Sequence, residues 1–258
     1  MATPIGLLAA MPEEIEALRA MIERPVVTER ARRVFTRGVL HGHEVVAVCS
    51  RWGKTAAAST ATELIASFGV DRIVFSGIAG GVSPEVHVGD VVVARTLMHH
   101  DLDASPFFAP GEVPLLGITR LPVDEAMSDS LLLAARAFLA RDAARAIEPA
   151  LRAKVLDTRA ARASDEPGAC RGDIASGDQV ITTSAQRARV LSVVPTAVCV
   201  EMEGAAVAQV CFEHGVPFAC VRTISDGADE HLDASVAPFF AGVAGAYTAG
   251  IIGRWLTA

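Results

Sequence analysis

The chain contains 258 residues, of which 51% are hydrophobic and 21% are charged. This composition supports a large buried core and excludes wholesale disorder. The net charge of −7 argues against a general nucleic-acid binder, because such a protein needs a basic face. Large single domains reach this length, and we expect one domain over residues 1–258.

The five cysteines show no CxxC spacing, so the sequence predicts neither a zinc site nor a disulfide framework. Cys199, Cys211 and Cys220 stand in apolar segments and are expected to be small core residues. A reducing, cytoplasmic setting fits this cysteine content. The first residues carry an apolar patch without a basic leader, and acids follow at once, which is not the pattern of a signal peptide. We therefore expect a cytoplasmic protein.

Short apolar runs and helical patterns alternate along the chain. The apolar runs predict buried strands at residues 5–10, 33–40, 44–50, 71–77, 88–94, 173–178, 197–202 and 217–225. The helical patterns cover residues 12–22, 53–68, 125–155, 184–193, 203–215 and the C-terminal stretch. A hairpin turn is predicted at residues 41–42 and a further turn at residues 78–82.

Two segments lack these patterns. Residues 99–122 form a polar, proline-rich loop, and the stretch near 155–172 is predicted to be a mobile surface insertion. The predicted strands are apolar throughout rather than alternating, which indicates a sheet covered by helices on both faces. The expected fold is α/β, a three-layer αβα domain with a mixed, largely parallel central sheet.

One uncharged segment, residues 234–253, is long enough to span a bilayer. It contains Pro238, and its large apolar residues recur at helical spacing, which favours a buried C-terminal helix. We therefore expect no contact with a membrane.

Acidic residues follow several of the predicted strands. Glu14 comes after the first strand, Glu201 and Glu203 stand at the end of another, and Asp226 follows the last. Ligands collect at the carboxyl ends of the strands in sheets of this kind. We expect these carboxylates to meet in one cleft, together with Arg222 and a glycine-rich turn.

Each of these residues also has a purely structural interpretation. Glu13 and Glu14 can complement the dipole of the helix that they begin. Glu203 can be an early-turn acid of its helix, and Asp226 can cap a turn. Arg222 can be a salt-bridge partner for one of the acids.

Metal and cofactor sites are not expected. His99, His100, Asp101 and Asp103 include metal-binding residue types, but adjacent side chains in a strand point to opposite faces. The glycines of the "SGIAGG" segment lack the GxGxxG spacing that binds dinucleotides.

Eight segments of the chain carry a resemblance to a known family. They are "IGLLAAMPEEIEAL", "GKTAAASTATELI", "GIAGGV" with "VGDVVVA" after it, "HDLDASPF", "IASGDQVI", "VEMEGAAVAQVC" and "VPFACVRTISDGAD". In this order they resemble the nucleoside phosphorylase/hydrolase superfamily. The "AAMPEE" segment is similar to its hydrolase branch, the nucleosidases of 5′-methylthioadenosine and S-adenosylhomocysteine.

The resemblance implies cleavage of the N-glycosidic bond between adenine and a 5′-thioribose, without a metal or cofactor. By the matching motifs, Glu14 activates the attacking water, and Asp226 protonates adenine N7 with support from Ser225. Glu203 binds the ribose hydroxyls, and Met202 packs on the sugar.

Further binding positions follow from the same resemblance. Gly80, the backbone of Ile181 and Arg222 match such positions, the last beside the attacking water. Phe107 matches an apolar residue that lines the partner subunit's 5′-thio pocket in family dimers, so we expect a homodimer. The expected partner is a purine nucleoside, not a nucleic acid or a membrane. Glu201 matches no functional position and is expected to be structural.

Two pocket positions depart from the family pattern. Ile78 stands where the family often has serine, and Val180 stands where it has an aromatic residue that stacks on the base. The loop near 106–116 and the insertion near 155–172 differ as well. Purine nucleoside phosphorylase and a futalosine-type nucleoside hydrolase therefore remain as alternatives.

A nucleoside-binding or storage protein on the same fold is the non-enzymatic alternative. The joint presence of Glu14, Glu203 and Asp226 argues against it, because binding alone needs no acid and base. Strict dependence on phosphate would identify a phosphorylase.

Overall fold

The structure, a computed structural model, describes residues 3–160, 166–230 and 237–258. The strands are β1 (Ile5–Ala9), β2 (Glu23–Arg30), β3 (Arg33–Leu40), β4 (His43–Cys49), β5 (Arg72–Gly81), β6 (Val91–His99), β7 (Leu121–Pro122), β8 (Ala169–Ser176), β9 (Ala197–Glu201) and β10 (Phe218–Asp226). The helices are α1 (Pro12–Arg19), α2 (Lys54–Phe68), α3 (Glu125–Arg141), α4 (Ala143–Ala146), α5 (Pro149–Ala160), α6 (Ser184–Val193), α7 (Gly204–His214) and α8 (Ala237–Leu256).

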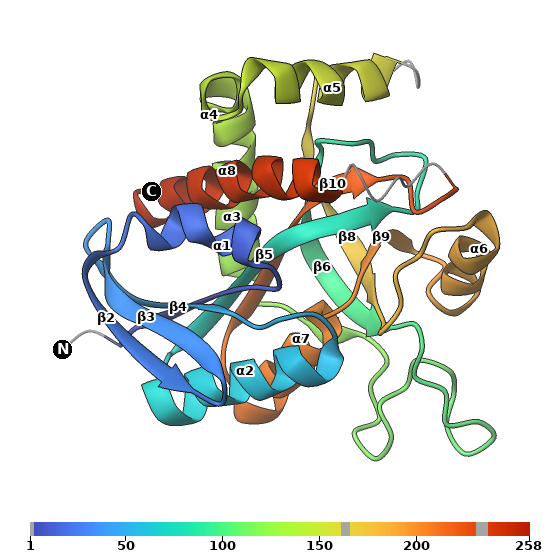
Figure 1. The fold of residues 1–258 in the computed structure, drawn as a ribbon. Coiled ribbons are helices and arrows are strands. Elements are labelled where there is room, and N and C mark those ends of the chain that lie inside the picture. Colours follow the sequence, from blue (N-terminus) through green and yellow to red (C-terminus); the bar gives the residue numbers. More distant parts are fainter. Residues whose placement is uncertain (1–2, 161–165, 231–236) are drawn as a thin grey trace.

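Helices cover both faces of the central sheet (Figure 1). On one face α1, α3 and α8 bury their apolar side chains against β1, β4, β6 and β10. On the other face α2 and α7 pack on the opposite side chains of the same strands. The apolar strands thus contribute side chains to two hydrophobic cores, one on each face of the sheet. The predicted three-layer α/β fold is confirmed.

The sheet is mixed, and part of it closes on itself. The strand order is β10-β6-β8-β9-β5-β1-β4-β3-β2, and β10 also pairs with β5. The second pairing joins β10, β6, β8, β9 and β5 into a closed ring. Within this ring β5 with β10 and β8 with both its neighbours are parallel, whereas β6 with β10 and β5 with β9 are antiparallel.

The closure explains why strands of opposite direction end at the same place. β5 and β9 pair only through their last residues, Gly80 with Val200 and Gly81 with Cys199. Because the pairing is antiparallel, the two carboxyl ends overlap rather than lie at opposite edges. The cleft predicted at one sheet edge therefore lies where the carboxyl ends of β5 and β9 overlap.

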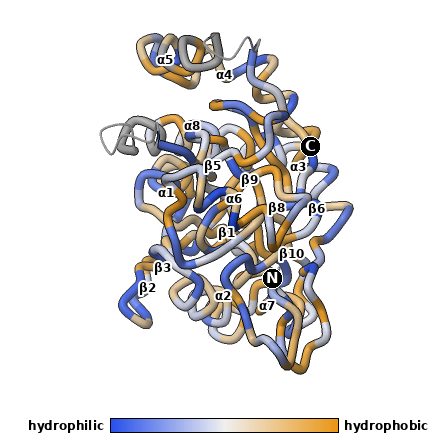
Figure 2. Tube along the Cα trace, turned by 90° about the vertical axis from the view of Figure 1, so that its right-hand side faces the viewer, coloured by the Kyte–Doolittle hydropathy of each residue, from blue (hydrophilic) through white to orange (hydrophobic). Residues whose placement is uncertain are grey.

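Two predicted boundaries were wrong. Residues 78–81 are the end of β5 and not a turn. They stay extended because β10 pairs with them on one side and β9 on the other. β8 begins at Ala169, inside the predicted insertion, while residues 161–165 of that insertion lie outside the described residues. The helices α4 and α5, which precede β8 in the chain, project past α8 in both Figure 1 and Figure 2.

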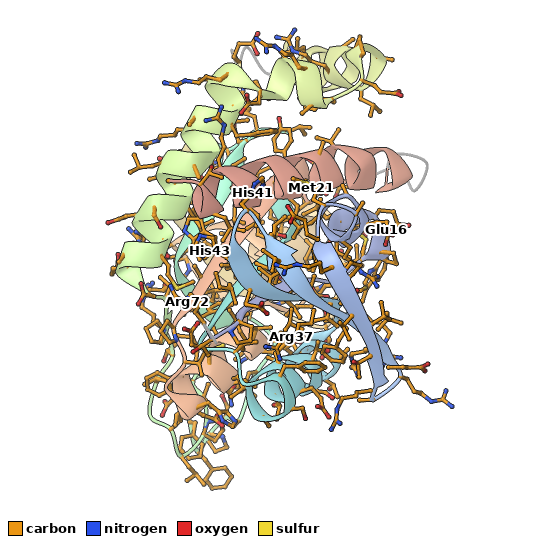
Figure 3. The ribbon with its side chains drawn as sticks, turned by 90° about the vertical axis from the view of Figure 1, so that its left-hand side faces the viewer. Glu16, Met21, Arg37, His41, His43 and Arg72 are labelled. Carbon is orange, nitrogen blue, oxygen red and sulfur yellow. The ribbon has the colours of Figure 1, made fainter. Side chains whose placement is uncertain are left out.

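No pattern in the sequence predicted β2. Its segment "ERPVVTER" lacks an apolar face, and every residue of the strand is exposed. It pairs only with β3 and forms the edge of the sheet, where proline and charged residues discourage further strand pairing. Figure 3 views this side of the molecule, with Arg37 of β3 and His43 of β4 labelled.

The C-terminal helix α8 packs on the sheet as predicted. Val243, Tyr247 and Ile251 are buried in the core that it shares with α1 and α3. No helix in the described part of the chain combines the length and apolarity that crossing a membrane requires.

A buried carboxylate of β8 joins this strand to β6 and to two neighbouring loops. Asp173 has no exposed surface. One of its oxygens accepts hydrogen bonds from Arg95 and Thr96, at 2.9 and 3.0 Å. The other accepts from Arg120 and Thr196, at 2.7 and 2.6 Å. These donors hold the pKa of Asp173 below its ordinary value against the opposing effect of burial.

We expect Asp173→Asn to lower the free energy of unfolding by about 2 kcal/mol at pH 7, because both arginines lose their carboxylate. The depressed pKa means that the carboxylate stabilises the fold above its unfolded pKa and ceases to do so as the pH falls. The difference between variant and wild type should therefore stay constant from pH 7 to about pH 5. It should shrink as the pH falls below the ordinary pKa of 3.8 in urea titrations. Asp129→Asn, which removes an exposed partner of Arg171, is the control. An equal effect of both variants would contradict the prediction.

Candidate active site

One pocket collects nearly all of the predicted site residues. Its lining includes Glu14, Ile78, Gly80, Val180, Ile181, Met202, Glu203, Arg222, Ser225 and Asp226. Phe107 is absent from this lining and its side chain is 85% exposed. Its predicted contact with a partner subunit stays a prediction. The remaining residues come from β1, β5, β8, β9 and β10 or the segments that follow them, so the carboxyl ends of these strands form the pocket.

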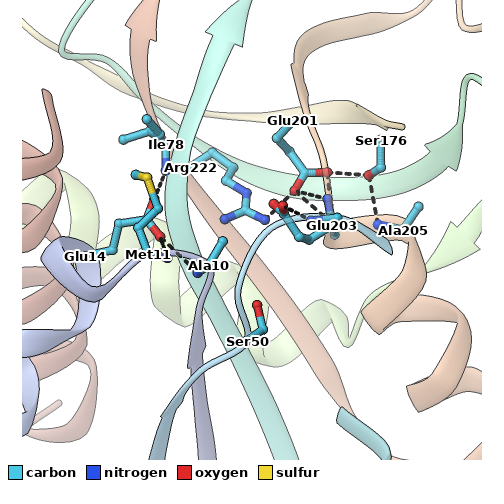
Figure 4. A network of polar contacts seen from close by, with 12 residues as sticks. Ala10, Met11, Glu14, Ser50, Ile78, Ser176, Glu201, Glu203, Ala205 and Arg222 are labelled. Atoms are coloured by element: carbon cyan, nitrogen blue, oxygen red, sulfur yellow. Dashed lines mark hydrogen bonds and ion pairs between the residues drawn. The ribbon is translucent and has the colours of Figure 1, made fainter. Parts of the chain in front are cut away.

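Glu14 is held by backbone amides in the first turn of α1. Its Oε2 accepts from the N–H groups of Ala10 and Met11, both at 2.9 Å. Its Oε1 accepts from the N–H of Ile78 at 2.9 Å. Ile78 thus contributes through its backbone, which any residue type could supply. Figure 4 shows these contacts.

The environment of Glu14 suits a proton acceptor. The side chain is buried, and burial raises its pKa above the ordinary value, against the opposing effects of Arg222 and the three N–H groups. A carboxylate offers about four acceptor positions. Since three are filled, one remains for the proton of a water molecule.

Glu201 and Arg222 form a buried ion pair beside this group. Arg222 Nη2 donates to Glu201 Oε2, and its guanidinium lies 4.0 Å from the centre of the Phe75 ring. Glu201 also accepts from Ser176 Oγ and from the N–H of Gly204, the latter at 2.8 and 2.9 Å. The expected structural role of Glu201 has a physical basis, because it binds the start of α7 to β8 and β10.

Glu203 lies two residues further on, at the N-cap of α7. Its backbone N–H donates to Glu201 Oε2 at 3.0 Å, while its side chain Oε1 accepts from the N–H of Gly53 at 2.8 Å. Burial and the neighbouring Glu201 carboxylate raise the pKa of Glu203 to about 8. The two acids at the end of β9 therefore differ in role: one is saturated by protein donors, and the other keeps acceptor positions for a ligand.

Asp226 ends β10 at a register shift between Ile224 and Asp226, a bulge that redirects the side chain. Its Oδ2 accepts from Ser225 Oγ at 2.6 Å, and its Oδ1 accepts from the N–H of Ala228 at 2.7 Å. A Cβ on Gly80 would lie 3.0 Å from Asp226 Oδ1. Glycine at this position lets the backbone of β5 approach the carboxylate closely.

Gly53 is a site residue that no sequence pattern predicted, and Gly77 belongs to the glycine-rich segment expected in the cleft but has a role that the sequence did not indicate. A Cβ on Gly77 would lie 2.4 Å from Arg222 Nη1 and 2.8 Å from Glu14 Oε1, so only glycine fits between these two groups. Gly53 has a φ of +91°, which favours glycine. Trp52 and Gln179 also line the pocket. A glycine at the first position of the predicted helix 53–68 was the one available signal for this segment.

The comparisons with known proteins agree with this geometry. Residues 4–256 match the family model described as the phosphorylase superfamily. The chain belongs to this superfamily. Over 236 residues it is 34% identical to a 5′-methylthioadenosine/S-adenosylhomocysteine nucleosidase of Anoxybacillus flavithermus, covering 91% of this chain and 90% of that protein.

Solved structures give the same relationship. The nucleosidase of the same description from Neisseria meningitidis, in complex with methylthio-immucillin-A, is 30% identical with a TM-score of 0.83 over 98% of both chains. The futalosine hydrolase of Helicobacter pylori is 29% identical with a TM-score of 0.78 over 98% of this chain and 97% of that one. The resemblance stated from the sequence motifs is confirmed.

The buried Glu203 predicts a stability change that depends on pH. Because its folded pKa exceeds the ordinary 4.5, wild-type stability is lost as the pH rises from that value through about 8. Glu203→Gln removes this loss. We expect the variant to be more stable than wild type by on the order of 2 kcal/mol at pH 9, with a small difference at pH 5.

Thermal unfolding of both proteins across this pH range measures the effect. Glu16→Gln, which removes an exposed carboxylate from α1, controls for the change in net charge. A difference that stays constant with pH, or that falls as the pH rises, would rule out a buried, proton-binding Glu203.

Proposed function

We propose that the protein hydrolyses the N-glycosidic bond of 5′-methylthioadenosine, S-adenosylhomocysteine or both, releasing adenine and the 5′-thioribose. One observation carries the proposal: Glu14, Glu203 and Asp226, far apart in the sequence, line one pocket. The relatives described above, which carry the name of this activity, support the same substrate class.

The proposed roles follow from what each carboxylate contacts. Adenine is a poor leaving group as an anion, so an acid must protonate it, and Asp226 is proposed to deliver that proton to N7. As the C1′–N9 bond breaks, the ribosyl centre becomes cation-like. Water attacks C1′, and Glu14 accepts its proton through the acceptor position that the three backbone N–H groups leave free.

Glu203 is proposed to bind the sugar. One carboxylate can accept hydrogen bonds from two ribose hydroxyls at once. Such donors favour the ionised form, so a nucleoside that binds would draw the proton off Glu203. The resulting negative charge lies close to the cation-like ribosyl centre and stabilises it.

Hydrolysis is favoured over phosphorolysis by the charges of the pocket. Among the described residues that line it, Arg222 is the one cation, and its guanidinium is already paired with Glu201. A phosphate ion needs several free cationic or N–H donors. It would also lie close to Glu14 and Glu203, whose charge would repel it.

A futalosine-type hydrolase is the second candidate. Val180 lines the pocket and is 49% exposed, so no aromatic ring selects the base from that position. The structural similarity to the Helicobacter pylori futalosine hydrolase favours this candidate as well.

We also propose that the protein works as a cytoplasmic homodimer in methionine salvage. Support comes from Phe107, a large apolar side chain that is 85% exposed on this chain. In a dimer it would complete the 5′-thio end of the partner subunit's pocket.

The substrate assignment is tested with a panel of 5′-modified adenine nucleosides and futalosine, with and without phosphate, followed by detection of the free base. We expect adenine from methylthioadenosine or adenosylhomocysteine at the same rate in both conditions. Release of the free base only in the presence of phosphate would identify the protein as a phosphorylase. Release from futalosine alone would favour the second candidate.

Variants of the two proposed catalytic acids separate binding from chemistry. Asp226→Asn cannot donate the proton, and we expect kcat to fall about 10²- to 10⁴-fold. Glu14→Gln should bind substrate in equilibrium measurements yet lose turnover to a similar extent. Both substitutions keep the side-chain shape, and unfolding curves verify the fold. Near wild-type release by Asp226→Asn would exclude Asp226 as the acid.

A further inference from the structure

Hydrogen bonds join the start of α2 and two loop segments beside Glu203. Lys54 Nζ donates to Asp101 Oδ1 at 2.5 Å. The backbone N–H of Asp178 donates to Asp101 Oδ2 at 2.8 Å, and the backbone N–H of Lys54 donates to Asp178 Oδ1 at 2.7 Å. These three contacts form a closed circuit, which we call the Lys54–Asp101–Asp178 latch.

The latch gives the "HHDLD" segment a role other than metal binding. Both oxygens of Asp101 are occupied by protein donors. Among the described residues no group of three histidine, cysteine, aspartate or glutamate side chains is placed to hold a metal ion.

The latch acts on Glu203 through the start of α2. Gly53 is the N-cap of this helix and has no side chain to satisfy the N–H groups there. Its own N–H donates to Glu203 Oε1, and the next N–H, that of Lys54, donates to Asp178. Where Lys54 is fixed, Gly53 is fixed as well, because the two are adjacent.

The same circuit reaches a second wall of the pocket. Asp178 directly precedes Gln179, Val180 and Ile181, which line the pocket. Only 20% of the Lys54 side chain and 18% of the Asp101 side chain are exposed. Shielding of this extent makes an ion pair stronger than one on the open surface.

We propose that Lys54, Asp101 and Asp178 are positioning residues that hold the Gly53 N–H on Glu203 and fix the 179–181 wall relative to it. The consequence for catalysis rests on the proposed function, in which Glu203 binds the ribose. Loosening the latch then weakens binding of the sugar more than it slows the chemical steps, because Glu14 and Asp226 lie outside the circuit.

Kinetics of adenine release test this consequence. We expect Asp101→Asn and Lys54→Met to raise KM about tenfold, while kcat changes less than about threefold. Lys54→Arg keeps the charge and should restore KM to within about threefold of wild type. Asp103→Asn removes an exposed carboxylate two residues along the same loop, bonded to Ser105, and should leave KM unchanged. Equal KM values for Asp101→Asn and Asp103→Asn would overturn the proposal.

A second readout does not depend on turnover. The Gly53 N–H lowers the pKa of Glu203, as does Arg222 of β10, whereas Glu201 of β9 and Glu14 of α1 raise it. If the latch holds Gly53, both Lys54→Met and Asp101→Asn loosen that bond and shift the titration of Glu203 to higher pH. If the charges of Lys54 and Asp101 acted on Glu203 directly, Lys54→Met would raise the pKa of Glu203 and Asp101→Asn would lower it.

Carboxyl-carbon NMR of glutamate-labelled protein follows this titration, and Glu203→Gln assigns the signal. Upward shifts in both variants support the latch. Shifts of opposite sign, or none in either, overturn it. Wild-type protein that releases no base from any nucleoside would refute the proposed function, while the titration would still decide the latch. Should Asp101→Asn fail to fold, Lys54→Met with its Lys54→Arg counterpart carries the kinetic test.

Discussion

The ion pair between Arg222 and Glu201 joins the strands on which the pocket is built. The two residues stand on β10 and β9, which do not pair with each other but are both neighbours of β5. Both side chains are buried, so separating them would leave an uncompensated charge in the protein interior, which is strongly unfavourable. Their attraction, together with the amides of α7 that bind Glu201, keeps the carboxyl ends of three strands together.

This pair also explains how one pocket holds several carboxylates. Glu14, Glu201 and Glu203 are all buried. Burial raises the pKa of Glu14 and of Glu203, and repulsion from the Glu201 and Glu14 carboxylates raises that of Glu203 further. Arg222 offsets part of that repulsion, and backbone N–H groups offset more, three at Glu14 and one at Glu203. The part that is not offset appears as the raised pKa values of Glu14 and Glu203. Raised values suit residues that exchange protons or that bind the hydroxyl groups of a ligand.

Glycines let the backbone come close enough for these contacts. Gly77 leaves room for Arg222 and Glu14 to share one face of β5, and Gly80 leaves room for Asp226. Gly53 adopts the positive φ that presents its N–H to Glu203. The geometry of the acids is therefore set by the absence of side chains at three positions as much as by the acids themselves. The latch extends this arrangement to the loops outside the sheet.

The sequence by itself determined the fold class and most of the site. Apolar runs of strand length alternate with helical patterns, and this alternation specifies a covered sheet whichever strand order is adopted. The acids that follow those strands could be named for the same reason, since strand ends open into solvent. The roles of Gly77, Gly53 and the Lys54–Asp101–Asp178 latch could not be predicted, because they depend on which segments become neighbours.

Only the tertiary structure decided the closure of the sheet, the extended conformation of residues 78–81 and the protein donors that occupy Glu201. A local pattern records which face of an element is apolar, but it does not record the partner of a strand. β2 is the extreme case, since its segment has no apolar face and becomes a strand only through hydrogen bonds to β3. Long-range pairing fixed these features, and pairing energy depends on residues that are distant in the sequence.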